Sequence, residues 1–154
     1  MKFRTSLILA LVILILDFVT KRWAESELIY GQQVSLTSFF NLVLVFNAGA
    51  AFSFLSDESG WQRWLFSGIS ICASVLIIYL LRKYFLEKLF CVSLSLILGG
   101  ALGNLWDRIA LGYVVDFLDF HYGGYHWPAF NVADSAICVG ALLLILESFK
   151  HKEK

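Results

Sequence analysis

Residues 7–16 read LILALVILIL, a run of apolar residues without a charge, a glycine or a proline. Three more apolar stretches follow it, at about 64–81, 88–106 and 132–149. A helix needs about 20 mostly apolar residues to cross the hydrocarbon core of a bilayer, and shorter stretches suffice when flanking residues reach the interface. With its flanks, the first run extends over about 5–23. The sequence therefore predicts one integral membrane domain of 154 residues with four transmembrane helices.

The composition agrees with a membrane protein. Hydrophobic residues make up 59% of the chain and charged residues 16%, whereas soluble domains are about half apolar. The formal net charge is +0 and no segment combines basic with aromatic residues, so we expect no nucleic-acid partner. Cys72, Cys91 and Cys138 lie in apolar stretches without metal-ligand spacing. We expect buried thiols, no disulfide framework and no metal site.

The distribution of Lys and Arg predicts the orientation, because cytoplasmic loops carry an excess of these residues. One side of the predicted membrane holds Lys2, Arg4, Arg82, Lys83, Lys88, Lys150, Lys152 and Lys154. The other side holds only Lys21, Arg22, Arg63 and Arg108. We therefore expect both termini in the cytoplasm. A signal peptide is the alternative for the first span, but Asp17 and Lys21 stand where small cleavage-site residues would be.

The two predicted outer loops differ in composition from the spans. Residues 33–46, in the loop at about 24–60, are rich in β-branched and aromatic residues, which favours one or two short strands. The loop at about 108–131 contains glycines and the one proline, which are turn signals, and a strand-like run around residues 114–118. The predicted fold class is a membrane all-α protein with a small β element.

Polar residues near the ends of the spans are candidates for function, because a charge in hydrocarbon costs several kcal/mol (about 3 by insertion scales) unless it is paired or hydrated. Asp17 and Lys21 are four residues apart and can form an ion pair on one helix face. Asn104 and Arg108 also share a face of the third span, in an interfacial polar cluster with Asp107.

Small residues precede that polar cluster on the third span. Gly99 and Gly103 are four residues apart, a small-xxx-small pattern that permits another helix to pack closely. Such packing would bring the polar end of the third span toward the other helices.

Two further aspartates have competing interpretations. Asp116 interrupts an apolar, strand-like run and is poorly explained by solvation, whereas Asp119 is expected to be a solvated surface acid. Asn131 and Asp134 open the fourth span, where they can form a capping box or belong to a site. The spacing leaves both possibilities open.

Two carboxyl groups held close together share one proton, because both cannot ionise cheaply. Such a pair hydrolyses amides through a water molecule, one member acting as base and the other as acid. His121 and His126 are taken as loop residues. Two other hypotheses remain: a small transporter or channel whose acids relay protons, and a non-enzymatic assembly factor that uses the glycine-rich helix as a partner surface.

Five segments, in order along the chain, match a known family. They are DFVTK at residues 17–21, FNAGAAFS at 46–53, GGALGNLWDRI at 99–109, VVDF at 114–117 and FNVADS at 130–135. With these motifs the chain resembles the bacterial lipoprotein signal peptidases (signal peptidase II) along almost its whole length.

The resemblance implies an aspartic endopeptidase in the bacterial inner membrane. Its substrates would be diacylglyceryl-modified prolipoproteins, cut on the N-terminal side of the lipidated cysteine near the outer (periplasmic) face. The implied fold has four transmembrane helices, an extracytoplasmic β-cradle, assigned here to about 24–60, and a short amphipathic helix or loop at about 108–131. We expect no cofactor, contact with membrane lipid and a monomer.

The resemblance also assigns roles to residues. By this likeness Asp116 and Asp134 are the catalytic pair. Side chains that bind substrate or support the pair would be Asn47, Asn104, Arg108 and Asn131. Structural roles would fall to Asp17, Lys21, Gly49, Gly99 and Gly103.

Overall fold

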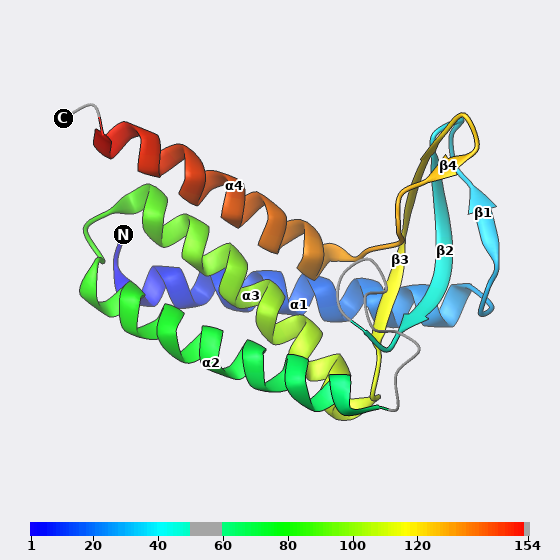
Figure 1. The fold of residues 1–154 in the computed structure, drawn as a ribbon, viewed down its shortest axis with the longest axis horizontal. Helices are drawn as coiled ribbons and strands as arrows, with labels where there is room; N and C mark the ends of the chain where they lie inside the picture. The colour runs from blue at the N-terminus through cyan, green and yellow to red at the C-terminus, as the bar shows by residue number, and fades with distance from the viewer. Residues whose placement is uncertain (50–59, 153–154) are drawn as a thin grey trace.

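The computed structural model describes residues 1–49 and 60–152. Four long helices form a bundle (Figure 1): α1 (Phe3–Glu27), α2 (Trp61–Lys83), α3 (Lys88–Ala110) and α4 (Val132–Lys152). Each is long and apolar enough to cross a membrane. The prediction of four apolar helices is confirmed.

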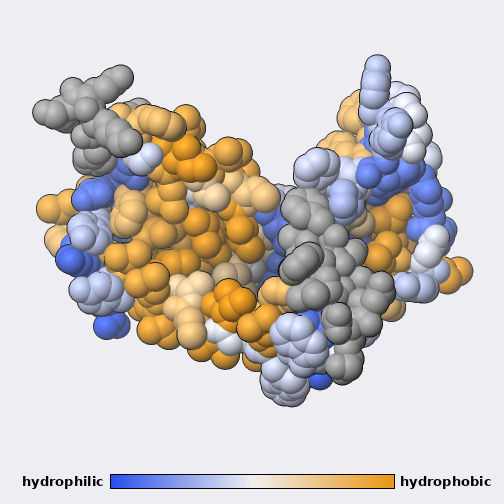
Figure 2. Space-filling model, viewed as in Figure 1, coloured by the Kyte–Doolittle hydropathy of each residue, from blue (hydrophilic) through white to orange (hydrophobic). Residues whose placement is uncertain are grey.

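Helix α3 is the central helix of the bundle. In its most apolar window 61% of residues are buried, against 17% in α1 and α4 and 22% in α2. The other helices therefore turn most of their Leu, Ile and Val side chains outward, and Figure 2 shows this apolar surface over the bundle. Lipid covers such a surface in a bilayer. For the same reason the prediction of buried thiols is wrong for Cys72 and Cys138, which are exposed, while Cys91 is buried.

Glycines permit the helices to approach α3 closely. A Cβ atom on Gly99 would lie 2.6 Å from the carbonyl oxygen of Ala10 in α1, and one on Gly103 would lie 2.5 Å from Oδ2 of Asp17. On α4, a Cβ on Gly140 would lie 2.7 Å from the carbonyl oxygen of Ser93. These contacts are typical of membrane helices, whose interfaces favour small residues.

A four-stranded antiparallel sheet lies at one end of the bundle, and both termini lie at the other end (Figure 1). Its strands, in spatial order, are β1 (Gln33–Ser35), β2 (Phe40–Asn47), β3 (Val114–Tyr122) and β4 (Tyr125–His126). The loop at about 24–60, to which the β-cradle was assigned, contains β1 and β2, and the second loop adds β3 and β4 to the same sheet. β2 and β3 form the centre of the sheet, so it joins the two loops.

The segment between α3 and α4 forms strands and turns where we expected an amphipathic helix or a loop. Its β-branched and aromatic residues pair with β2, and a turn at Gly123 and Gly124, with φ values of 57° and 86°, reverses the chain into β4. Glycine adopts such positive φ values at low cost. The described residues between Ala110 and Val132 contain no helix.

Candidate active site

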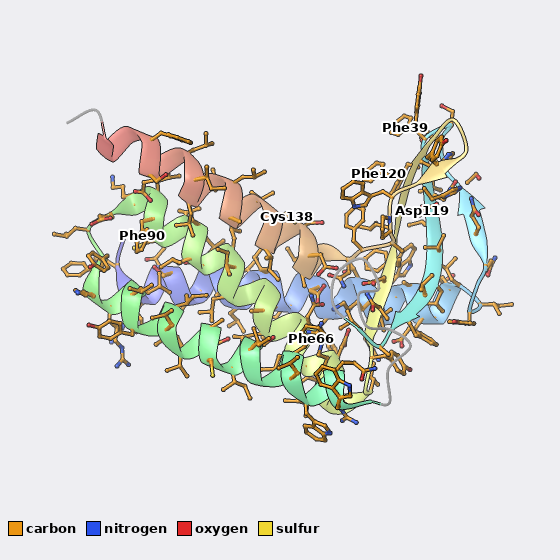
Figure 3. The ribbon with its side chains drawn as sticks, viewed as in Figure 1. Phe39, Phe66, Phe90, Asp119, Phe120 and Cys138 are labelled. Carbon is orange, nitrogen blue, oxygen red and sulfur yellow. The ribbon has the colours of Figure 1, made fainter. Side chains whose placement is uncertain are left out.

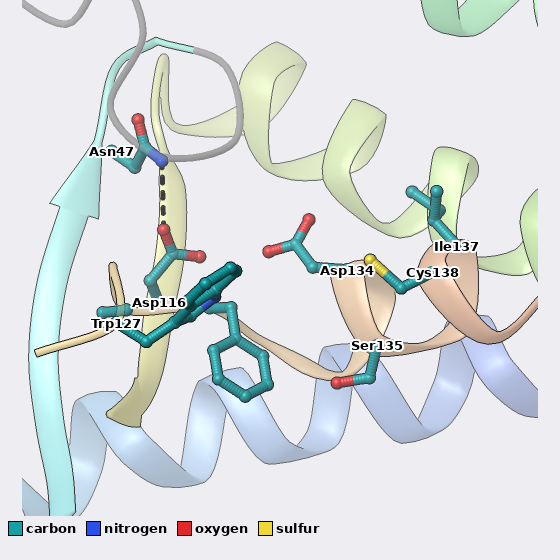
Figure 4. Close-up of a pocket in the computed structure, with 9 residues that line it drawn as sticks. Asn47, Asp116, Trp127, Asp134, Ser135, Ile137 and Cys138 are labelled. Atoms are coloured by element: carbon teal, nitrogen blue, oxygen red, sulfur yellow. Dashed lines mark hydrogen bonds between the residues drawn. The ribbon is translucent and has the colours of Figure 1, made fainter. Parts of the chain in front are cut away.

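Asp116 and Asp134 face each other across a cavity of about 260 Å³, next to the sheet (Figure 4). Asp116 belongs to β3 and Asp134 to the first turn of α4. The cavity is lined by Asn47, Asp116, Trp127, Ala129, Phe130, Asp134, Ser135, Ile137 and Cys138. Two carboxyl groups thus share a mostly apolar pocket.

The position of Asp116 follows from how the chain leaves α3. Gly112, with φ 91°, ends the helix, and its N–H group and that of Leu111 both donate to the carbonyl oxygen of Asp107, at 3.2 and 2.7 Å. A glycine with positive φ at this place is a common helix terminator. β3 therefore starts beside the end of α3, and the N–H group of Val115 donates to Oδ2 of Asp107 at 3.2 Å.

Two amides hold the Asp116 carboxyl, which is only 2% exposed. Nδ2 of Asn47 donates to Oδ2 of Asp116 at 3.1 Å, and Nδ2 of Asn131 donates to Oδ1 at 2.7 Å. Burial, followed by the nearby Asp134 carboxylate, raises the pKa of Asp116 from 3.8 to about 7. The protonated form of Asp116 is therefore favoured at pH values below about 7.

Asp134 and Asn131 form the capping box that their spacing suggested. The N–H group of Asp134 donates to Oδ1 of Asn131 at 2.9 Å, and the N–H group of Asn131 donates to Oδ2 of Asp134 at 3.3 Å. Nδ2 of Asn104 donates to the other oxygen, Oδ1 of Asp134, at 2.7 Å. The Asp134 side chain therefore both caps α4 and lines the cavity.

The segment before α4 is tied to β3. Phe130 and Leu118 form an isolated antiparallel bridge, with hydrogen bonds of 3.0 and 2.9 Å between them. Asn131 is fully buried, and its Nδ2 also contacts Oδ1 of Asn104 and the carbonyl oxygen of Val115, each at 3.2 Å. Asn131 thus connects α3, β3 and α4 at the cavity.

A buried ion cluster lies behind the cavity. The ion pair expected between Asp17 and Lys21 is present at 2.7 Å, and Lys21 also pairs with Asp107 at 2.9 Å. Oδ1 of Asp17 accepts the N–H group of Ala133 at 2.8 Å, at the start of α4. The cluster therefore connects α1, α3 and α4 around one ammonium group.

Sequence reasoning did not single out Asp107 as a site residue. The structure gives its carboxylate three partners, the Lys21 ammonium, the Arg22 guanidinium and the N–H group of Val115, and it is 1% exposed. Its place three residues after Asn104 on α3 was a usable signal, because residues at that spacing lie on the same side of a helix.

The guanidinium of Arg108 connects α3 to the end of β2. Nη1 and Nη2 lie 3.4 Å from the carbonyl oxygens of Asn104 and Gly49, and the group stacks over Phe66 at 5.5 Å. The N–H group of Gly49 donates to Oδ1 of Asn47 at 3.0 Å. Residues 50–53 of the second motif lie outside the described residues.

The prediction that Asp119 is a solvated acid is wrong. Asp119 is 5% exposed and accepts hydrogen bonds from Nδ2 of Asn41 at 2.7 Å and from Nδ1 of His126 at 2.9 Å. Figure 3 shows it within the sheet, away from the helix bundle. The cause is the register of β2 and β3, which places Asn41 directly opposite Asp119.

Comparison with known proteins decides the family. The sequence model described as "Signal peptidase (SPase) II" matches residues 9–150, nearly the whole chain. The chain belongs to the signal peptidase II family. Because this is a peptidase family, the hypotheses of a proton relay and of an assembly factor are set aside.

Known members of the signal peptidase II family are close in sequence. The "Lipoprotein signal peptidase" of Janthinobacterium sp. (strain Marseille) is 54% identical over 146 residues, which cover 95% of this chain and 88% of the relative. That of Burkholderia vietnamiensis is 56% identical over 143 residues, covering 93% and 86%.

Solved structures agree with the fold of this signal peptidase II. One described as a bacterial membrane enzyme has a TM-score of 0.87 at 34% identity and covers 96% of this chain and 89% of its own. A second with the same description has a TM-score of 0.83, also at 34% identity, covering 95% and 93%. The protein is thus a multi-pass membrane peptidase for lipoprotein processing.

Proposed function

We propose that this signal peptidase II is an aspartic endopeptidase that removes the signal peptide from diacylglyceryl-modified prolipoproteins, N-terminal to the lipidated cysteine. Asp116 and Asp134 are its catalytic pair. One observation carries this proposal: the two carboxyl groups face each other across a single cavity, and each is held by amide donors. No other described pair of carboxyl groups shares that cavity.

The proposed reaction needs one protonated and one ionised carboxyl group. The raised pKa of Asp116, about 7, supports Asp116 as the protonated member. Asp134 takes a proton from a water molecule, whose oxygen attacks the scissile carbonyl carbon, while Asp116 donates its proton to the carbonyl oxygen. The tetrahedral intermediate then collapses: the C–N bond breaks, the proton on Asp134 passes to the leaving nitrogen, and the new carboxyl group returns a proton to Asp116.

The surrounding polar groups fit this division of roles. Asn47 and Asn131 hold Asp116 in place, and Asn104 donates to Asp134. The positive charge of Arg108 acts on both carboxyl groups. Its guanidinium is therefore suited to position the substrate backbone beside the pair and to stabilise the negative charge that develops on the carbonyl oxygen.

The proposed site lies near the outer face of the membrane, and the sheet is extracytoplasmic. The excess of Lys and Arg near the two termini and between α2 and α3 supports this orientation. All the tryptophans lie at the sheet end and are exposed, as expected of interfacial anchors: Trp23, Trp61, Trp64, Trp106 and Trp127. At this depth a substrate's acyl chains stay in lipid while water reaches the scissile bond. We also propose that the protein works as a monomer, because its four helices together enclose one site.

The test is cleavage of a prolipoprotein by the purified protein in detergent. We expect the wild type to cut the diacylglyceryl-modified substrate and to leave the same polypeptide without lipid intact. Asp116→Asn should abolish cleavage, because the amide cannot donate or accept the catalytic proton. Asp119→Asn is the matched control: it is the same substitution of a buried acid on the same strand, and its amide oxygen still accepts from Asn41.

Cleavage that requires the lipid and Asp116, but not Asp119, would support the proposal. A folded Asp116→Asn variant that still cuts at the wild-type rate would contradict the assignment of the pair. Equal cleavage with and without the lipid would contradict the proposed substrate class.

A further inference from the structure

Lys21 is fully buried, and all three of its N–H groups have acceptors. Its Nζ lies 2.7 Å from Oδ2 of Asp17, 2.9 Å from Oδ2 of Asp107 and 2.9 Å from Oδ1 of Asn104. An ammonium group has three donors and no acceptor, so these contacts use its whole capacity. Neither proposed catalytic aspartate is among its partners. The hydrogen-bonded connection from Lys21 to the pair therefore passes through another residue, in addition to the through-space effect of its charge on both aspartates.

Asn104 is the residue that connects Lys21 to the cavity. Its Oδ1 accepts from Nζ of Lys21 at 2.9 Å and from Nδ2 of Asn131 at 3.2 Å, while its own Nδ2 donates to Asp134 at 2.7 Å. The two ends of an amide are nearly equal in shape but opposite in hydrogen bonding. If this amide turned over, its NH₂ group would face two donors, and its oxygen would face a carboxylate. The donors on one side therefore fix the amide that serves Asp134 on the other.

Lys21 is the stronger of the two donors that hold this orientation. A hydrogen bond from an ammonium group is roughly twice as strong as one between neutral groups. Nδ2 of Asn131 is also divided among other acceptors, since it lies 2.7 Å from Asp116 and 3.2 Å from the carbonyl oxygen of Val115. The ammonium in turn is held by carboxylates from two helices, Asp17 on α1 and Asp107 on α3.

We propose that Lys21 is a positioning residue for the peptidase reaction: it holds the Asn104 amide in the orientation that presents an N–H group to the Asp134 carboxylate. This inference rests on the proposed function, in which Asp134 activates water. It gives the buried cluster a role in catalysis beyond joining the helices, because it determines which end of the amide meets the catalytic carboxylate.

The main variant is Lys21→Met combined with Asp107→Asn. Methionine has about the length of lysine but no donor, and the second substitution removes one negative charge, so the net charge of the cluster is unchanged. An amide at position 107 still offers an oxygen to the N–H group of Val115. Asp107→Asn alone is the reference, and Lys88→Met, an exposed lysine at the other end of the bundle, is the control for the substitution itself.

Steady-state cleavage of the lipidated substrate is then measured, with the melting temperature of each variant. Against the wild type, whose cluster has the same net charge, we expect the double variant to lose up to about 100-fold in kcat with little change in KM, since a misdirected catalytic group slows chemistry more than binding. The reference shows how much of that loss comes from Asp107→Asn alone. In an Asn104→Ala background, the same change at Lys21 should leave kcat almost unaltered. A merely structural lysine would lower kcat by the same factor in both backgrounds, and that result would overturn the proposal, as would an unchanged kcat in the double variant.

A second variant keeps the test informative if the double variant does not fold. Asn104→Asp retains an oxygen for Lys21 but loses the donor to Asp134, so the contact with Lys21 is preserved. We expect a folded protein with a strongly reduced kcat and a similar KM, and a wild-type kcat would overturn the proposal. If the wild type itself fails to cut the lipidated substrate, the proposed function fails. If the wild type cuts and these variants match it, only the role of Lys21 fails.

Discussion

Asn131 and Asp134 cap α4 reciprocally, each side chain accepting the backbone N–H group of the other residue, at 2.9 and 3.3 Å. The same Asp134 side chain presents its second oxygen to Asn104 beside the cavity. One carboxyl group thus has a structural contact and a proposed chemical task. An amide can make the capping contact but cannot exchange the catalytic proton. Substitution of Asp134 by asparagine therefore separates the two roles.

Asp134→Asn should therefore abolish cleavage while the helix stays capped. The amide oxygen still accepts the N–H group of Asn131, so stability should fall by about 1 kcal/mol or less, the usual size of a charge effect at a helix terminus. Activity should fall at least about 100-fold, because acid–base catalysis typically contributes that much. Cleavage rates and thermal unfolding in detergent measure both. Near wild-type activity of the Asp134→Asn variant would mean that Asp134 only caps α4 and is not catalytic.

The pH dependence of cleavage should reflect Asp116. Its pKa is about 7 and it is proposed to donate a proton, so kcat should fall as pH rises above about 7 and Asp116 ionises. Because two coupled groups titrate together, the observed value belongs to the pair. Initial rates between pH 5 and pH 9 test this, with unfolding followed at each pH. A kcat that keeps rising through pH 9 would disagree with the expected sign.

Asp116 should also make stability depend on pH. The folded protein keeps a proton on this group up to about pH 7, whereas the unfolded chain releases it near 3.8. The stability from this difference is fully present below the lower value and is lost as pH rises to the higher one. The melting temperature of the wild type should therefore fall relative to that of Asp116→Asn across this window. A constant difference between the two proteins would contradict the raised pKa.

Gly103→Ala should destabilise the protein. The added Cβ would lie 2.5 Å from Oδ2 of Asp17, inside the buried cluster, and overpacking of this kind costs about 1–3 kcal/mol. Gly68→Ala is the matched control: it is another helical glycine, and its Cβ would meet nothing within 4 Å. Thermal unfolding should show a lower melting temperature for the first variant and an equal or higher one for the second.

Arg108→Lys should lower kcat/KM by about 10-fold or more, because one ammonium group cannot reproduce the contacts of a guanidinium, and a hydrogen bond from a charged group is worth about 1.5–3 kcal/mol. Arg63→Lys is the control. Arg63 donates to the carbonyl oxygen of Ile109 at 2.8 Å, and a lysine can do the same. Equal activities for the two variants would restrict Arg108 to anchoring the helix.

Much of the helical part of the fold was predictable from sequence. Continuous apolar runs identify membrane helices because the bilayer sets their length and hydropathy. The ion pair of Asp17 with Lys21 was also predictable, since both residues lie on one helix. Their burial against Asp107 was not predictable, because the residue pattern of one helix does not indicate which other helix packs against it.

The sheet was less predictable, for a physical reason. Alternation along a strand indicates which side chains share a face, but not which strand lies opposite. Residues 114–118 were recognised as strand-like, yet their pairing with β2 was missed. That pairing is what buries Asp119 against Asn41 and brings Asn47 to Asp116. A residue's environment in a sheet is decided by its partner, which lies far away in the chain.

The hydrogen bond from Ala133 to Asp17 has a consequence for biosynthesis. It joins the first helix to the last, and the proposed catalytic pair also needs Asp134 from that last helix. A chain emerging from the ribosome therefore holds an unfinished centre until α4 has entered the membrane beside α1. A copy without α4 would lack Asp134, so on the proposed function it would have no catalytic pair.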